Sequence, residues 1–413
     1  MTCISEICPL YSSSKQGKSS VANPSHELNI YTSVNQLPFA WERLSQQTSI
    51  FLQKDYLQAL ERAAPASYQF FYLVFHYENK VIGIALAHYF PFAGAKGIRV
   101  DDSKAIWRQQ VQRILLKQLN WNFLVIGNST LTGEQGVYFS SAISPQAQLD
   151  LLFSAGEQIQ RDYQLSVDVT VSKDWYVDSA YDCQTSVRSG FHKCVIQPNM
   201  ILPIQPNWYN FEQYLSDMRS KYRVRIKRAF KKRKGIEQRC LGLEEIKQQE
   251  ATIYRLYGNI ATAADLNVAE LPAHYFYSLK EQLGEKFQVL GYFDRGQLIG
   301  FCTTLQDHQI LEAHFLGLEE SYNSSHQLYL NMLLDIVQLG IAQGSSEITF
   351  SRTAMEIKSS IGAVPHDMFG YIKHHNPLVH HFVPALFRFF ESEMKWIQRR
   401  PFKDSAMENS QMN

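Results

Sequence analysis

Two titratable side chains, Glu312 and His314, stand two residues apart in the apolar segment ILEAHFLGLE. In a strand, residues two apart project from the same face, whereas Leu311, Ala313 and Phe315 project from the other face. A carboxylate or imidazole held in this way can deprotonate an ammonium group, directly or through a water molecule. The same pattern also fits a buried pair that hydrogen-bonds without catalytic duty.

A basic run is the second feature that could do chemistry. It has ten Lys or Arg and no acid among the sixteen residues from 219 to 234. On a helix, apolar side chains recur every three or four residues and form one stripe, which leaves the basic side chains on the other faces. This surface is either a solvated helix face or a phosphate-binding surface for a nucleotide, CoA, a tRNA backbone or an anionic lipid head group. The apolar stripe consists of Tyr222, Ile226, Ala229 and Phe230.

Cysteine and histidine spacing does not indicate a metal site. The six cysteines are scattered without a C-x-x-C pair, and this usage fits a reducing compartment. Five histidines cluster near the C-terminus but follow no established ligand spacing, so we expect no metal. They are His366, His374, His375, His380 and His381.

Composition limits the partners. The formal net charge is +1, so no global field draws the chain onto nucleic acid or membrane, and any charged partner must be recognised by a local patch. The N-terminal residues lack the basic and apolar regions of a signal peptide, and no apolar run is long enough to span a bilayer. We therefore expect a cytoplasmic protein, with at most a peripheral contact with an anionic membrane surface.

The elements that must position these residues follow one order twice, which predicts an α/β chain. The first half has helical patterns, a hairpin at 70–77 and 80–90, a helix near 106–119 and a strand at 123–126. The second half repeats this order with a hairpin at 287–293 and 297–305, a strand at 310–318, a helix at about 326–342 and a strand at 347–350. Both hairpins contain an Ile-Gly pair, Ile82–Gly83 and Ile299–Gly300. We expect two copies of one fold, each with its own mixed, largely antiparallel sheet flanked by helices. The predicted boundaries are a disordered tail at 1–27, domains at 28–205 and 206–395, and a polar tail at 396–413.

This order of elements resembles the central unit of the GCN5-related N-acetyltransferase (GNAT) superfamily. The segment SKYRVRIKRAFKKRKGIEQR resembles the K-x-R-x-x-I-[KR]-[KR]-A…G-[IV] signature of FemAB-type aminoacyl transferases and of BioF2-like acetyltransferases. A later segment resembles the closing F-K-x-x-[FW]-G motif of the same families. The matching positions are Lys221, Arg223, Ile226, Lys227, Arg228, Ala229, Gly235 and Ile236 for the first motif, and Ile357, Lys358, Ile361 and Gly362 for the second.

The resemblance implies two tandem GNAT-like domains and an N-acyltransferase that moves an acetyl or aminoacyl group to an amine. The donor co-substrate would be acyl-CoA or aminoacyl-tRNA, without a tightly bound cofactor, and the acceptor a small molecule or a cell-wall precursor. The superfamily's glycine-containing pyrophosphate loop is replaced here by LEESYNSSHQLY, which favours the FemAB branch. A rival interpretation is a non-catalytic module that docks on RNA or membrane phosphates through the basic run.

The resemblance also assigns candidate residues. Lys358 becomes a cation for the oxyanion that forms during acyl transfer, beside Glu312 and His314 as candidate bases. Arg223 is the strongest candidate for a phosphate contact. The whole predicted phosphate-binding set is Lys221, Arg223, Lys227 and Arg228.

Overall fold

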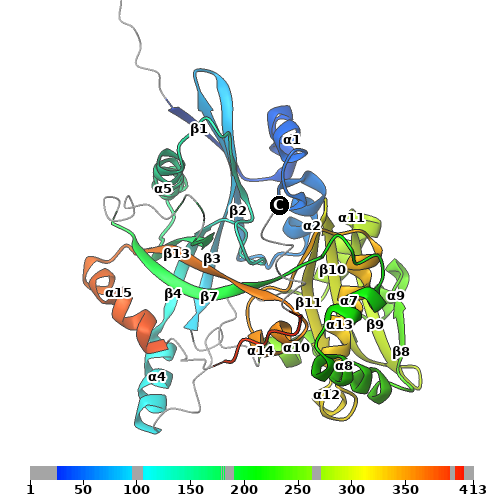
Figure 1. Cartoon of the computed structure of the whole chain (residues 1–413). Coiled ribbons are helices and arrows are strands. Elements are labelled where there is room, and N and C mark those ends of the chain that lie inside the picture. Colours follow the sequence, from blue (N-terminus) through cyan, green and yellow to red (C-terminus); the bar gives the residue numbers. More distant parts are fainter. Residues whose placement is uncertain are drawn as a thin grey trace, which may run out of the picture.

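The computed structural model describes residues 26–94, 106–177, 179, 181, 190–262, 271–390 and 396–403. Its strands form a 13-stranded mixed sheet that runs through the whole described part of the chain, with helices packed on both faces (Figure 1). The strand order is β1-β2-β3-β4-β6-β13-β7-β12-β11-β10-β9-β8, and β5 pairs with β3 beside this path.

The first half of the chain contributes β1 to β7. Its described elements are β1 (His26–Tyr31), α1 (Phe39–Ser45), α2 (Lys54–Arg62), β2 (Gln69–Tyr77), β3 (Lys80–Ala93), α4 (Ile106–Gln118), β4 (Asn120–Ile126), β5 (Val137–Phe139), α5 (Pro145–Asp162), β6 (Val169–Tyr176) and β7 (His192–Pro203).

The second half contributes the remaining strands. Its described elements are α7 (Phe211–Asp217), α8 (Ser220–Lys232), β8 (Glu237–Cys240), α9 (Leu243–Gln248), α10 (Glu250–Ala261), α11 (Tyr275–Leu283), β9 (Phe287–Asp294), β10 (Gln297–Asp307), β11 (Ile310–Leu318), α12 (Glu320–His326), α13 (Leu328–Ala342), β12 (Glu347–Thr349), α14 (Met355–Ser360), β13 (Val364–His374) and α15 (Pro377–Phe390).

The predicted repeat of one α/β unit is confirmed by the strand pairing. In the first half β1, β2, β3 and β4 pair antiparallel in sequence order, and β4 pairs parallel with β6 after the long helix α5. In the second half β8, β9, β10 and β11 pair antiparallel, and β11 pairs parallel with β12 after α13. Each half therefore contains the same unit, four antiparallel strands followed by a long helix and a parallel strand.

The two units do not keep separate sheets, and the expectation of one sheet per half is corrected here. The next strand of each unit comes from the other half: β13 pairs with β6, β7 pairs with β12, and β7 and β13 pair with each other at the centre. Each exchanged strand covers an edge whose backbone N–H and C=O groups would otherwise lack partners. The predicted domain boundary after residue 205 stays a prediction. No strand spans it, since β7 ends at Pro203, but β7 and β13 each pair with a strand from the other half.

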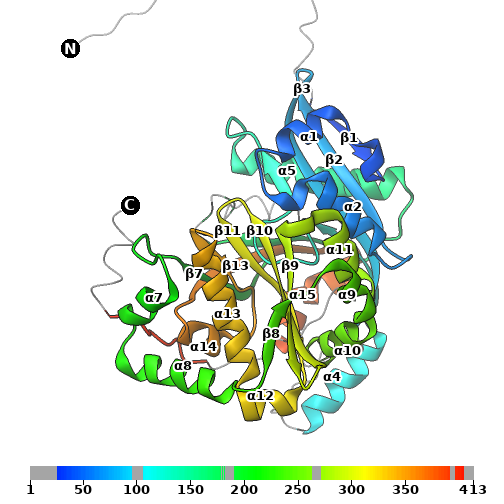
Figure 2. The same ribbon diagram turned by 90° about the vertical axis from the view of Figure 1, so that its right-hand side faces the viewer.

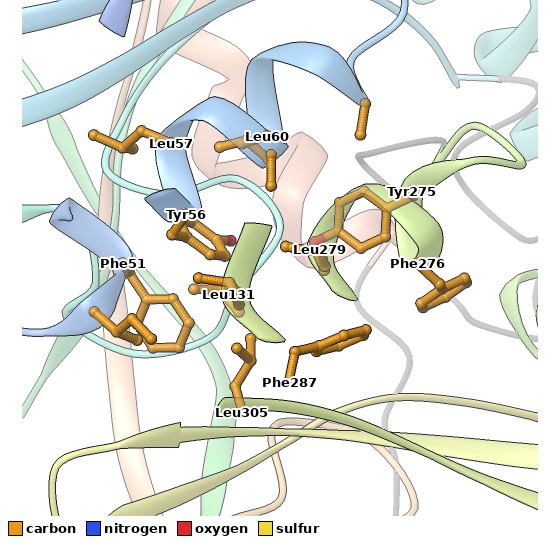
Figure 3. Close-up of a cluster of buried hydrophobic side chains, with 14 of the residues drawn as sticks. Phe51, Tyr56, Leu57, Leu60, Leu131, Tyr275, Phe276, Leu279, Phe287 and Leu305 are labelled. Atoms are coloured by element: carbon orange, nitrogen blue, oxygen red, sulfur yellow. The ribbon is translucent and has the colours of Figure 1, made fainter. Parts of the chain in front are cut away.

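The helices before the two hairpins meet in a core that belongs to both halves. The pattern Leu-x-x-x-Tyr occurs at Leu52–Tyr56 and again at Leu271–Tyr275, and it places both tyrosines on the inner faces of α2 and α11. Both side chains are fully buried, at 0% and 1% exposed. Figure 3 shows them among Phe51, Leu57, Leu60, Leu131, Phe276, Leu279, Phe287 and Leu305.

The chain ends behave differently from each other. Residues 1–25 lie outside the described residues, so the predicted N-terminal tail stays a prediction. Residues 396–403, which we expected to belong to a polar tail, pack on the second half. Phe402 is buried beside Trp208, and the amide of Arg219 donates to the carbonyl of Pro401 over 2.8 Å. The apolar ring of Phe402 accounts for this packing, because burial removes it from water.

Candidate active site

Glu312 lies where two parallel strands separate. Strand β11 pairs with β12 at three positions, the last of which joins Glu312 to Thr349. Strand β12 ends there, whereas β11 continues to Leu318. Beyond Glu312, no described strand covers this side of β11. A forked sheet of this kind leaves backbone groups free to bind an extended ligand that contains amides.

The carboxyl group of Glu312 is buried and only partly hydrogen-bonded. The side chain is 2% exposed, and the hydroxyl of Thr349 donates to its Oε2. Its Oε1 has no hydrogen-bond partner within the described part of the chain. Burial raises the pKa of Glu312 to about 8, and the negative charges of Asp307 and Glu347 act in the same direction. A carboxylate with such a pKa is a matched base for an ammonium group near neutral pH.

Lys358 lies close to Glu312 but points into the backbone. Its Nζ donates to the carbonyl oxygens of Phe350, Ser351 and Arg352, over 2.5, 3.2 and 2.6 Å. The side chain is 4% exposed, and burial lowers the pKa of Lys358 to about 7 although the charge of Glu312 opposes the shift. An ammonium group has three donors, and all three are engaged here. Lys358 therefore acts on the site through the chain segment 350–352.

His314 is held by two side chains and stays neutral. Its Nε2 lies 3.1 Å from the hydroxyl of Tyr275, and its Nδ1 lies 3.3 Å from that of Thr303. Burial lowers the pKa of His314 to about 3. Burial raises the pKa of both Tyr275 and Tyr56, and the charge of Glu312 acts in the same direction on Tyr56. His314 thus supports Tyr275, and both of its ring nitrogens are occupied.

The first half offers an internal comparison for this site. The corresponding ladder, between β4 and β6, ends at the pair Ile126–Ser172. Two residues after each ladder the backbone turns into the left-handed region, at Asp174 (φ 63°) and at Ser351 (φ 57°). Leu124 in the first half and Leu311 in the second both lie against a glycine of the crossover helix, Gly156 of α5 and Gly340 of α13. Val125, the next residue after Leu124, is 3% exposed and pairs with Val171, so it stands where the second half has Glu312. The buried carboxyl exists in one copy of the unit.

Asn128 and His314 each lie two residues beyond the end of a ladder. The amide of Asn128 donates to the hydroxyl of Tyr56 over 3.2 Å, as His314 contacts that of Tyr275. Each of the two side chains thus supports a buried tyrosine. Because only one of them flanks a carboxylate, we restrict the candidate site to the fork of the second half.

The predicted apolar stripe of the basic run is seen in α8. Tyr222, Ile226 and Ala229 are buried and Phe230 is half-buried. The helix packs on α13, where the side-chain amide of Asn331 donates to the carbonyl of Ala229 over 3.2 Å (Figure 2). An ion pair between Arg233 and Asp335 joins the same two helices.

The predicted phosphate-binding residues divide into two groups. Lys221, Lys227 and Arg228 are exposed. Arg223 is engaged by its own chain, because its Nη1 donates to the carbonyl of Met218 over 2.7 Å. Within the described part of the chain, none of the four residues hydrogen-bonds or forms an ion pair with Glu312. The structure therefore groups Glu312, His314 and Lys358 and leaves the basic set on a separate surface of the second half.

Sequence reasoning missed the residues that other strands and helices bring to Glu312. These include Thr349, Tyr56, Tyr176 and Asn199, and the last three come from the first half of the chain. The repeated Leu-x-x-x-Tyr pattern was the one signal in the sequence that could have paired Tyr56 with Tyr275.

The described residues contain no group of three or more His, Cys, Asp or Glu side chains placed to hold a metal ion. None of their helices combines the length and the apolar character that crossing a membrane requires.

Several solved structures resemble the chain. FemX has a TM-score of 0.48 at 11% identity, and the match covers 80% of this chain and 93% of FemX. A tandem GNAT protein from the clavulanic acid biosynthesis pathway has a TM-score of 0.48 at 10% identity, over 85% and 99%. L-PGS from Bacillus licheniformis has a TM-score of 0.44 at 10% identity, over 83% and 96%. No family model and no curated protein matches the sequence.

Proposed function

We propose that the protein is an N-acyltransferase in which Glu312 is the general base. The observation that carries this proposal is the buried carboxyl of Glu312, with its unpaired Oε1, at the fork between β11 and β12. The first half has an apolar side chain at the corresponding position, so packing alone does not require a carboxylate there. A buried ionisable group with a shifted pKa is typical of a catalytic site.

The reaction needs one proton acceptor and no covalent nucleophile. The ionised Glu312 takes a proton from the acceptor's ammonium group, and the neutral amine attacks the carbonyl carbon of the acyl donor. The nitrogen of the tetrahedral intermediate still carries a surplus proton. As the intermediate collapses and the bond to the leaving group breaks, this proton passes to the leaving group, and the proton on Glu312 is released to solvent. The backbone N–H groups of β11 beyond Glu312 that neither β10 nor Thr303 engages are the candidate donors to the developing oxyanion.

The donor's phosphates are expected on α8 rather than in a glycine loop. The segment that replaces the loop folds as helix α12, and the side-chain oxygen of Asn323 accepts from the amide of Tyr329 at the start of α13. That amide is therefore not free to bind a pyrophosphate. The exposed side chains of Lys227 and Arg228 are free of such contacts, and they suit the phosphates of either acyl-CoA or aminoacyl-tRNA.

The test is the variant Glu312→Gln, assayed with acetyl-CoA and with aminoacyl-tRNA as separate donors. We expect turnover to fall about 10²-fold or more with donor affinity unchanged, because the variant loses proton transfer and keeps its shape. For the native protein, the rate should rise as the pH increases through about 8, since Glu312 acts in its ionised form. The matched control is Glu281→Gln, at an exposed carboxylate paired with Arg62.

A stability measurement separates loss of the base from loss of the fold. Because the pKa of Glu312 is raised, its ionisation costs free energy in the folded state. This cost grows as the pH rises from the ordinary pKa of a glutamate, 4.5, to the raised pKa of about 8. At pH 8, Glu312→Gln should therefore have a higher free energy of unfolding than the native protein, by on the order of 2 kcal/mol, and should unfold at a higher denaturant concentration. Full turnover in this variant would rule out Glu312 as the base. Salt-dependent RNA or lipid binding without any donor binding would favour the non-catalytic module.

A further inference from the structure

Four neighbouring strands present one shared polar face beside Glu312. Glu312 pairs with Thr349, Thr349 pairs with Ile201, and Asn199 pairs with His366. Directly paired residues, and residues two apart in one strand, project from the same face of a sheet. All five side chains therefore share a face that runs across β11, β12, β7 and β13. The strand exchange between the halves is what brings Asn199 to this position.

Two buried acceptors on this face have no donor. The Oε1 atom of Glu312 and the Oδ1 atom of Asn199 lack hydrogen-bond partners among the described residues, and the side chains are 2% and 0% exposed. The Nδ2 of Asn199 donates to the hydroxyl of Tyr176 over 2.8 Å, which fixes the amide. A buried polar atom without a partner is costly, so two of them on one face indicate a ligand that brings donors.

The surroundings of this face carry an excess of negative charge. Glu347 is half-buried, and burial raises the pKa of both Glu347 and Glu134. Glu134 accepts from the amide of Tyr176 over 2.9 Å. Burial raises the pKa of Tyr176, and the charges of Glu312, Glu134 and Glu347 act in the same direction.

The cations nearby are already engaged with the chain. Lys358 binds three backbone carbonyls, and Lys173 binds two carbonyls and the carboxylate of Asp174. Arg352 lies 3.9 Å from Asp174 as well. His366, at the end of the polar face, is exposed.

We infer that Glu312, Asn199, Tyr176 and Glu347 form the acceptor site, and that the acceptor is an aliphatic primary ammonium without a carboxylate on the adjacent carbon. This inference rests on the proposed function of Glu312. The ammonium donates to the two unpaired acceptors, and its charge is balanced by the glutamates. An α-amino acid is disfavoured because its carboxylate would lie among like charges.

The first half thus contributes to the reaction although it lacks the buried carboxyl. Asn199 and Tyr176 belong to β7 and β6, whereas Glu312 and Glu347 belong to β11 and β12. An acceptor held at this junction touches both units, and its reacting nitrogen faces the base of the second unit. The exchange of strands is therefore a requirement of the site.

The experiment compares three probes of similar chain length by calorimetry on the full chain at pH 8.5. Pentylamine is the cation, 1-pentanol is its neutral counterpart, and norleucine is pentylamine with a carboxylate on the carbon that bears the nitrogen. We expect pentylamine to bind at least about 10-fold more tightly than either of the others. Equal binding of norleucine or of 1-pentanol would overturn the inference.

Two variants test the residues, with Glu281→Gln as the control at an exposed carboxylate. Asn199→Leu and Glu347→Gln should each weaken pentylamine binding about 5-fold or more, and the control should leave it unchanged. Glu347 is half-buried and its replacement by Gln is conservative, so Glu347→Gln tests the acceptor site even if Asn199→Leu does not fold. Unchanged pentylamine affinity in Glu347→Gln would overturn the site.

The failure of this inference can be told from the failure of the proposed function, because the binding assay needs no acyl donor. Pentylamine binding that depends on Glu347, combined with full turnover in Glu312→Gln, would keep the acceptor site and remove the base. Loss of turnover in Glu312→Gln, combined with pentylamine binding that ignores Asn199 and Glu347, would keep the base and remove the acceptor site.

Discussion

Lys358 shows how a residue can sit at the candidate site without touching the substrate. Its ammonium group holds the carbonyls of Phe350, Ser351 and Arg352, which follow the strand that carries Thr349. Among these residues, Ser351 has a positive φ of 57°, so the chain turns sharply at this point. The cation thereby fixes the segment that forms one side of the fork beside Glu312.

For Lys358→Met we expect a loss of folding stability of about 2–4 kcal/mol, because three buried carbonyls lose their donor and the variant cannot replace it. Urea unfolding of the variant beside native protein measures this difference. The control Lys227→Met, at an exposed position of α8, should change stability by less than about 0.5 kcal/mol. Unchanged stability together with lost turnover would instead indicate that the charge of Lys358 stabilises the oxyanion of acyl transfer.

At this scale the sequence could predict the strand that carries Glu312 and His314, because an alternation of apolar and polar residues is a local signal. It could not predict Thr349, Asn199 or Tyr176 as neighbours. These contacts depend on the register of strands far apart in the chain, and that register is set by packing of whole sheets.

Helix α8 carries two kinds of basic side chain that the sequence could not distinguish, one bonded to the chain itself and the other exposed to solvent. The stripe of Tyr222, Ile226 and Ala229 could be predicted because helical periodicity determines which face is buried. The engagement of Arg223 could not, since its partner is the carbonyl of Met218, at the end of the preceding short helix. Arg223 caps a corner of the chain, whereas Lys227 and Arg228 project into solvent.

We therefore expect the double variant Lys227→Ala/Arg228→Ala to weaken binding of a phosphate-bearing donor by about 1–3 kcal/mol, with a shallower dependence on salt. Folding stability should stay within about 0.5 kcal/mol of the native value. Arg223→Ala should behave in the opposite way and lower stability by about 1 kcal/mol through the lost hydrogen bonds. Donor titrations at two salt concentrations, with urea unfolding of each variant, check both. Equal donor affinity in all three proteins would make α8 a solvated surface.

For the whole molecule, the sequence predicted the element order of each half and missed how the halves join. Element order follows from local periodicity and from the repeated Ile-Gly hairpins, so it is readable along the chain. The exchange of β7 and β13 leaves no local trace, because it depends on pairing between strands that are far apart in the chain. The exchange is favoured because each of the two strands pairs with an open sheet edge of the other half.

The exchange makes the two halves one folding unit, and cleavage of the chain tests this. Pro206 and Asn207 are exposed in the connection between the halves, so a protease site inserted there can be cut without disturbing β7. We expect the two fragments to stay together and to unfold in a single transition, because the central pairing of β7 with β13 and the core around Tyr56 and Tyr275 belong to both.

A fragment of residues 26–206 produced alone should fail to fold cooperatively. It lacks β13, so the edge of β6 remains unpaired, and it exposes the buried face of α2 that α11 covers in the intact chain. Far-ultraviolet circular dichroism during thermal unfolding, with a dye that binds exposed apolar surface, measures both effects. If that fragment instead melts in one sharp transition, each half holds its own fold and the strand exchange serves assembly of the site alone.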